Sequence, residues 1–201
     1  MTKGQETRRA ILEQAAQVFS VRGYFGASMD DLLQATKLTK GGIYNHFASK
    51  ENLALEAFDY AMELYSARFK EFLAGKRNTR DRLLAFTTLF RSVVDDPMLP
   101  GGCPVLNTAV ESSDDTNPAL RERAQQACDD WREFIVRTIT RGAELGDVRP
   151  GTDAQAVASV MIAAVEGAMM LHKLYDDKRH MYRTTDHLVA FIESFLQEKT
   201  L

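Results

Sequence analysis

Apolar residues recur at spacings of three and four along almost the whole chain, and this helical periodicity constrains the fold more than any other feature. The alternation of apolar and polar residues that is typical of strands is almost absent. One stretch carries Phe58, Met62, Tyr65, Phe69 and Phe72 at successive spacings of four, three, four and three, which puts all of them on one helix face. With 45% apolar residues among 201, the chain can bury a sizeable core. The sequence therefore predicts an all-α protein.

Capping residues and glycine or proline breakers divide this pattern into about nine predicted helices. Ser28, with Asp31 three residues later, has the pattern of a capping box, and Thr39 can cap the next short helix. The predicted helices are a first one that ends at Gly23, short ones that open at Ser28 and Thr39, a long one from Ser49 to Gly75, and the segments 79–94, 103–111, 117–146, 153–175 and 185–196.

Cysteine content and hydropathy predict a cytoplasmic protein. Cys103 and Cys128 form no Cys-x-x-Cys pair, which favours a reducing compartment. No apolar segment follows the first charged residues, so we expect no secretory signal. The longest apolar stretch, 156–171, contains polar residues and is shorter than the roughly 20 residues of a membrane span. We therefore expect a soluble protein without a membrane partner.

Charge is divided unevenly along the chain. Residues 1–50 hold seven basic and four acidic side chains, a net charge of +3, whereas the remaining 151 residues hold 18 basic and 24 acidic side chains, a net charge of −6. A basic segment on an acidic body is typical of a nucleic-acid-binding module joined to a different kind of domain. The two short helices that open at Ser28 and Thr39, joined by a tight turn, form a helix-turn-helix candidate in this basic segment.

Residues 39–47 have the pattern of a recognition helix, which must enter a DNA groove and present hydrogen-bond donors on its outer face. Ile43 and Phe47 are four apart and are predicted to point to the core. Gly41 and Gly42 each lower helix stability by about 1 kcal/mol relative to alanine. Close approach of the backbone to DNA would explain them, but glycines also occur in ordinary bundles, so this pattern alone leaves both interpretations open. The outer surface is predicted to carry Lys40, Gly41, Tyr44, Asn45 and His46.

An enzyme built on a helical bundle finds no support in the sequence. A di-iron bundle requires Glu-x-x-His pairs, and none of the four histidines has a glutamate three residues before it. Phosphate-binding glycine loops and the Gly-x-Ser-x-Gly motif are absent as well. We therefore predict no catalytic residue, no metal and no cofactor. The alternative to a DNA-binding protein is a helical ligand-binding or scaffold protein without a DNA function.

Four runs of residues carry a family pattern: 7–12 (Thr-Arg-Arg-Ala-Ile-Leu), 19–24 (Phe-Ser-Val-Arg-Gly-Tyr), 28–32 (Ser-Met-Asp-Asp-Leu) and, most specifically, 40–53 (Lys-Gly-Gly-Ile-Tyr-Asn-His-Phe-Ala-Ser-Lys-Glu-Asn-Leu). Through these runs, residues 4–64 resemble the N-terminal domain of the TetR family of transcriptional regulators. Lys37 stands where the family often has the glycine of the turn, so a positive φ there would strain the backbone.

The resemblance implies a homodimer that reads a palindromic operator in double-stranded DNA, usually a repressor released by a small molecule or an electrophile. It implies a DNA-binding domain at 4–64, with the helix-turn-helix at 28–47, and an effector-binding and dimerisation domain at 65–201. The operator, the effector and the choice between repression and activation stay open. The implied DNA contacts are Lys40, Gly41 and Asn45 to base edges or sugar, Tyr44, His46 and Lys50 to phosphates, and Ser28 and Thr39, which combine capping with phosphate contacts.

The effector pocket is harder to predict, because apolar residues at helical spacing can line a cavity or simply fill a core. Asn107 and Glu111, four apart, could orient a ligand or could hydrogen-bond to a neighbouring loop, and the sequence does not decide. The candidate pocket residues are Met62, Tyr65, Phe69, Phe90, Cys103, Leu106, Asn107, Trp131, Ile135, Met161, Val165 and Met169.

Cys103 is a candidate sensor of electrophiles. It follows two glycines, expected to leave its thiol accessible, and it sits near a helix N-terminus, where the helix dipole lowers a thiol pKa. A Gly-Cys segment at this place is similar to that of several TetR-like regulators. The alternative is a small structural cysteine.

The last two long helices resemble the dimer interface of the family. Residues 156–171 are apolar nearly all round, as a helix needs when it packs on its own core and on a partner. The candidate interface residues are Val160, Ala164, Gly167, Leu171, Val189, Ile192 and Phe195.

Overall fold

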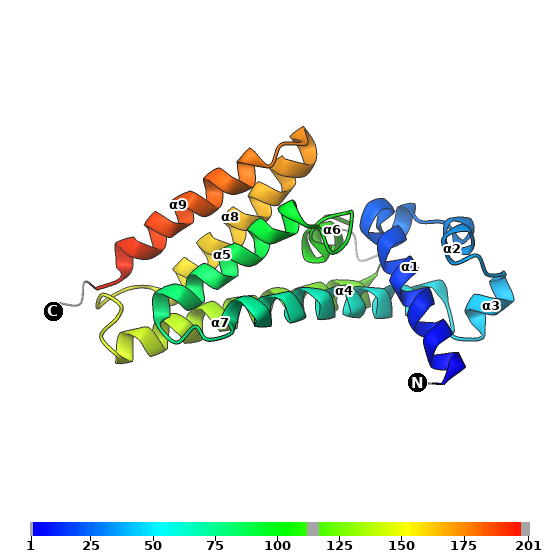
Figure 1. The fold of residues 1–201 in the computed structure, drawn as a ribbon, viewed down its shortest axis with the longest axis horizontal. Helices are drawn as coiled ribbons and strands as arrows, with labels where there is room; N and C mark the ends of the chain where they lie inside the picture. Colours follow the sequence, from blue (N-terminus) through cyan, green and yellow to red (C-terminus); the bar gives the residue numbers. More distant parts are fainter. Residues whose placement is uncertain (1, 112–116, 198–201) are drawn as a thin grey trace. The chain divides into compact units, whose positions relative to one another are not determined.

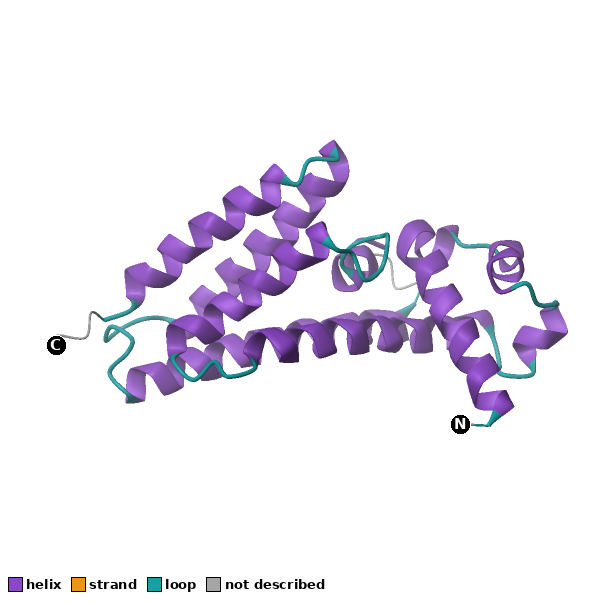
Figure 2. Ribbon diagram, viewed as in Figure 1, coloured by secondary structure: helices purple, strands orange, loops and turns teal. Residues whose placement is uncertain are grey.

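The computed structural model describes residues 2–111 and 117–197, and within these ranges the chain is all-α, as predicted (Figures 1 and 2). One isolated bridge between Val148 and Leu196 is the only strand-like pairing in the described ranges. The helices are α1 (Lys3–Gly26), α2 (Met29–Thr36), α3 (Lys40–Tyr44), α4 (Lys50–Leu73), α5 (Thr79–Asp95), α6 (Pro104–Glu111), α7 (Pro118–Glu144), α8 (Ala154–Tyr175) and α9 (Arg179–Phe195).

The local start signals that the sequence contains are used as predicted. The Ser28 hydroxyl accepts the Asp31 N–H at 3.1 Å while the Asp31 carboxylate accepts the Ser28 N–H at 2.8 Å, which completes the capping box of α2. Thr39 caps α3 by accepting the Gly42 N–H at 3.2 Å. Lys37 has φ 57° and ψ 27°, so this lysine adopts the left-handed conformation of the turn between the two helices.

The start of α9 was predicted six residues too late, at Thr185. The helix begins at Arg179, whose N–H is accepted by the Asp177 carboxylate at 2.9 Å. The N-cap residue itself, Lys178, makes no capping hydrogen bond with its side chain, so the usual sequence signal is missing. Met181 in the first turn is fully buried and ties this turn to the core.

The chain forms two compact units, and the described residues of 1–64 and 98–127 make up the first. Residues 65–97 and 128–201 make up the second, again as far as they are described. The segment that contains α6 therefore packs with the first 64 residues. The predicted division by function, at residues 64 and 65, stays a prediction.

The first unit is held together by aliphatic and small side chains from α1 to α4. α1 packs against α2 and α6, and α2 packs against α3. Full burial of each large aliphatic side chain stabilises the fold by about 1.5–3 kcal/mol. The buried cluster comprises Ile11, Ala15, Ala16, Leu32, Ile43, Phe47, Leu53, Ala57, Ala61 and Leu99.

The second unit packs α5 against α8 and α9, and α8 against α9. An aromatic cluster fills its interior, with neighbouring ring centroids between 4.9 and 6.3 Å apart, and it comprises Phe69, Phe86, Phe90, Trp131 and Phe134. By length and composition alone α8 could cross a membrane, the one such helix in the described ranges. A core helix of a soluble protein can have the same composition, so this finding assigns no location.

Candidate nucleic-acid interface

The outer face of α3 is exposed and polar, and its inner face is fully buried. Ile43 and Phe47 are only 1 and 2% exposed, so they anchor the helix on the core of the first unit. Lys40, Tyr44 and Asn45 are exposed on the other side, and His46, just after the helix, is half-buried. This arrangement presents an ammonium, a phenol and an amide to solvent from one short helix.

The two glycines of α3 differ in their surroundings. A Cβ on Gly41 would meet no heavy atom within 4 Å, because this residue belongs to the exposed face. A Cβ on Gly42 would lie 3.4 Å from Leu38 Cβ, against the preceding turn. Of the two glycines, Gly41 is therefore the one that lets another molecule approach the helix backbone.

The two capping residues have different capacities to bind a phosphate. The Ser28 hydroxyl donates to the Asp31 carboxylate at 2.7 Å, and these hydrogen bonds from Ser28 lower the pKa of Asp31. Both donors of Ser28 are thus directed to Asp31. The Thr39 hydroxyl accepts the Gly42 N–H and makes no other hydrogen bond to the described part of the chain, so its proton is available to a phosphate oxygen.

Lys50 lies in the first turn of α4 and is half-buried. Its ammonium donates to the Tyr24 carbonyl at 2.8 Å and lies 4.6 Å from the centroid of the Tyr24 ring. Burial lowers the pKa of Lys50, while the nearby Glu111 and Asp31 carboxylates act in the opposite direction. An ammonium has three N–H donors, so two remain for a phosphate once the Tyr24 carbonyl is bonded.

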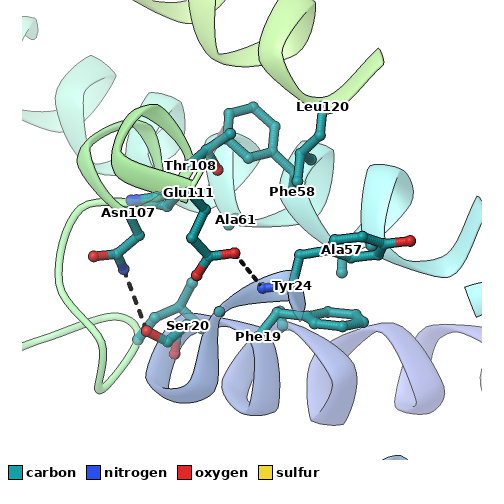
Figure 3. A pocket seen from close by; sticks show the side chains of 15 residues that line it. Phe19, Ser20, Tyr24, Ala57, Phe58, Ala61, Asn107, Thr108, Glu111 and Leu120 are labelled. Carbon is teal, nitrogen blue, oxygen red and sulfur yellow. Dashed lines mark hydrogen bonds between the residues drawn. The ribbon is translucent and has the colours of Figure 1, made fainter. Parts of the chain in front are cut away.

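A cavity of about 50 Å³ lies inside the first unit, between α1, α4, α6 and the start of α7 (Figure 3). Its walls are mostly alanine and phenylalanine side chains from α1 and α4, such as Phe19, Ala57 and Phe58. Its polar side is formed by Ser20 of α1 and by Asn107 and Glu111 of α6. Asn107 is the one predicted pocket residue that lines this cavity.

The remaining predicted pocket residues lie elsewhere. Phe69, Phe90 and Trp131 belong to the aromatic cluster of the second unit. Met62 and Leu106 are half-buried. The others are buried at 0–2% exposure, namely Tyr65, Cys103, Ile135, Met161, Val165 and Met169. Whether any of these lines an effector site stays a prediction.

The structure identifies the hydrogen-bond partners of Asn107 and Glu111, which the sequence left open. Asn107 Nδ2 donates to the carbonyls of Ser20 and Gly101, at 3.2 and 3.0 Å. Glu111 Oε2 accepts the Tyr24 N–H at 2.7 Å. Both side chains therefore bond to the end of α1 and to the segment before α6, while also facing the cavity.

Cys103 is buried, with 1% of its surface exposed, so the expected accessible thiol is wrong. A Cβ on Gly101 would lie 1.6 Å from the Ser20 carbonyl oxygen, which shows that this glycine permits close packing of two backbone segments. Close packing around the thiol replaces the predicted access to it. Cys128 is half-buried in α7, and burial raises the pKa of its thiol.

Most of the predicted interface residues on α8 and α9 are at least partly exposed. Val160 is 48% exposed, and Ala164, Gly167, Leu171 and Val189 are half-buried. Ile192 and Phe195 are buried within the second unit, at 0 and 7% exposure, because they point to the core side of α9. A groove runs between α8 and α9 beside Val160 and Ala164, and it adds residues that the sequence did not indicate: Arg183, Thr184, His187 and Phe191.

Comparison with known proteins gives matches over both units. The family described as bacterial regulatory proteins, tetR family, matches residues 11–57, and the family described as tetracyclin repressor-like, C-terminal domain, matches residues 79–188, more than half of the chain. The HTH-type transcriptional repressor DhaR of Mycobacterium sp. strain GP1 is 26% identical over 177 residues, which are 83% of this chain and 82% of the repressor.

Two solved structures are similar over nearly their whole length. A TetR transcriptional regulator from Chloroflexus aurantiacus has a TM-score of 0.93 and 47% identity, with 98% of each chain covered. A TetR family regulator from Cytophaga hutchinsonii has a TM-score of 0.88 and 34% identity, with 99% of each chain covered.

Proposed function

Because this chain belongs to the TetR family of bacterial transcriptional regulators, we propose that it binds an operator in double-stranded DNA as a homodimer and releases it when a small-molecule effector binds. The cytoplasm is the compartment in which such a regulator acts. The observation that carries the proposal is the exposed face of α3, where Lys40, Tyr44 and Asn45 stand over the buried anchors Ile43 and Phe47.

A short helix with this face suits the major groove of DNA, which admits an α-helix and presents a distinct hydrogen-bond pattern for each base pair. Lys40, Gly41 and Asn45 would then read base edges or sugar. Tyr44, His46 and Lys50 would contact phosphates and set the register. Thr39 has a free hydroxyl proton for a phosphate, whereas Ser28 would have to give up a hydrogen bond to Asp31.

The dimer would form through α8 and α9. Val160, Ala164, Gly167, Leu171 and Val189 offer partly exposed apolar or small surface on these helices, and a charge-poor surface of this kind suits a permanent interface. A two-fold dimer reads a palindrome because each copy contacts one half-site. We leave Ile192 and Phe195 out of the interface because their side chains are buried in the protomer.

The effector is proposed as a reversibly bound small molecule. Of the two effector classes, a reactive electrophile is less supported, since Cys103 is buried and Cys128 is half-buried with a raised thiol pKa. The thiolate is the nucleophilic form of cysteine, so both features slow attack on an electrophile.

The test begins with duplexes selected from a random pool by the wild-type protein. Tyr44→Ala and Lys50→Ala should weaken binding to all of these duplexes, and each lost phosphate contact should lower the slope of log affinity against log salt by about 0.9. Tyr175→Ala and Lys70→Ala are matched controls, because these side chains are exposed in the second unit. Unchanged affinity in the Tyr44→Ala, Lys50→Ala double variant at physiological salt would overturn the proposal.

A further inference from the structure

Two side chains of α6 complete the hydrogen bonding of α1 at the point where that helix is interrupted. Gly23 has φ 72° and ψ 173°, so the regular helix stops there. In a continuous helix the Tyr24 N–H would donate to the Ser20 carbonyl four residues earlier. Here the Ser20 carbonyl accepts from Asn107 Nδ2 at 3.2 Å, and the Tyr24 N–H donates to Glu111 Oε2 at 2.7 Å. Asn107 and Glu111, one turn apart on α6, thus take the two places of a helical hydrogen bond.

The Glu111 carboxylate occupies the space that a side chain at Gly23 would need. A Cβ on Gly23 would lie 1.4 Å from Glu111 Oε1 and 2.4 Å from its Cδ. The Phe25 N–H is also directed to Glu111 Oε2, at 3.4 Å. Figure 3 shows the carboxylate of Glu111 against this end of α1. The contact is therefore fitted to a glycine and to a side chain of the length of glutamate.

Tyr24 connects this contact to a predicted DNA contact. Its N–H is bonded to Glu111, and its carbonyl accepts the Lys50 ammonium at 2.8 Å. The Lys50 ammonium also lies over the Tyr24 ring, 4.6 Å from its centroid. The position of the Lys50 charge consequently depends on the position of the Tyr24 main chain and ring, which Glu111 fixes.

We propose that Glu111 is a positioning residue for DNA binding: by bonding the Tyr24 N–H it holds the Tyr24 carbonyl where the carbonyl orients the Lys50 ammonium toward a phosphate. The inference rests on the proposed function, in which Lys50 is a phosphate contact. Glu111 lies 61 positions after Lys50 in the sequence and belongs to α6, outside the helix-turn-helix.

The reach of the Glu111 side chain, rather than its charge, is the property that matters in this arrangement. Glu111 and Lys50 are both half-buried, and solvent screens the attraction between charges at such positions. The hydrogen bond to the Tyr24 N–H instead requires an acceptor at one particular place. Glutamine can supply that acceptor without the charge, and aspartate keeps the charge but is one methylene too short.

The experiment compares Glu111→Gln, Glu111→Asp and Lys50→Ala in the full-length protein, with Glu63→Ala as a control that removes an exposed glutamate elsewhere in the first unit. DNA affinity is measured against salt on a duplex selected by the wild type. Lys50→Ala and Glu111→Asp should each lower the slope by about 0.9 per protomer bound, so that the wild-type advantage shrinks by about 3.5-fold when salt is raised about fourfold. Glu111→Gln and Glu63→Ala should keep the wild-type slope.

A purely structural role of Glu111 would reduce affinity without changing the slope, so the slope separates the two explanations. The Glu111→Asp, Lys50→Ala double variant should have the slope of Lys50→Ala alone, because both changes remove the same contact. Wild-type slope in Glu111→Asp, or a slope that follows charge and drops in Glu111→Gln, overturns the inference. Failure of the proposed function looks different, since the wild type itself would then select no duplex. Thermal unfolding of each variant identifies any that is not folded, and Glu111→Gln then still tests reach against charge.

Discussion

Replacing Gly41 by alanine should separate helix stability from DNA binding, because the two are expected to change in opposite directions. A Cβ at this position would meet no heavy atom within 4 Å. The folded protein therefore accommodates the methyl group without strain, and helix propensity should raise the free energy of unfolding by up to about 1 kcal/mol. In the proposed complex, the same methyl group would stand between α3 and the DNA groove.

The size of the expected loss follows from the distance dependence of hydrogen bonds. A methyl group on the exposed face of α3 would hold the backbone away from DNA, and a donor–acceptor distance of about 3.6 Å is no longer a hydrogen bond. Loss of one good contact to a base edge costs about 1–3 kcal/mol. This corresponds to binding that is about fivefold to about 150-fold weaker.

Gly42→Ala is the matched control. Its Cβ would lie 3.4 Å from Leu38 Cβ and 3.5 Å from Thr39 Oγ1, which are ordinary contact distances within the preceding turn. DNA affinity in this variant should stay within about twofold of wild type, as for a substitution that touches no binding surface. Fluorescence anisotropy with a selected duplex, next to urea unfolding, measures both quantities. Equal losses of affinity in the two variants, or wild-type affinity in Gly41→Ala, would refute the reasoning that Gly41 admits DNA to the backbone.

Three further predictions concern the proposed dimer, the cysteines and the segment before α6. Val160→Asp places a charge on an exposed apolar position that the dimer would bury, so sedimentation velocity should show dissociation, and a wild type that is monomeric at micromolar concentration contradicts the interface. Cys103, at 1% exposure, should react with N-ethylmaleimide more slowly than Cys128, and mass spectrometry that finds Cys103 labelled first would show that its burial is transient. Gly101→Ala would put a Cβ 1.6 Å from a backbone oxygen of α1, so urea unfolding should show a loss of about 1–3 kcal/mol, and wild-type stability would contradict the close packing of these segments.

The parts of the fold that were predictable are those with a local cause. A capping box such as Ser28–Asp31 acts over three residues, so sequence and structure agree on the start of α2. Lys37 takes the left-handed conformation expected from its place in the turn. α9 shows the opposite case, since its first turn depends on Asp177 and on burial of Met181 in the core, which is a tertiary effect.

The exposed face of α3 was predictable for the same reason, because Ile43 and Phe47 alone determine which side of a short helix turns outward. The pocket was not. Phe90 and Trp131 share their periodicity with every other core residue, and only packing shows that their rings contact each other, with centroids 5.3 Å apart. Cys103 followed glycines that indicated access, yet Gly101 serves close packing instead.

Gly23 shows how one residue can satisfy a local and a distant requirement together. Its positive φ ends the regular part of α1, which is the role that the sequence indicates for a glycine at a helix end. Its missing side chain also admits the carboxylate of Glu111, from a residue that lies 87 positions after the Tyr24 that it bonds. Spacing on α6 predicts that Asn107 and Glu111 share a face, but not what that face meets, because the partner is brought there by the fold. The contact between α6 and α1 therefore becomes visible only in the structure, and it places a residue outside the helix-turn-helix in control of Tyr24 and Lys50.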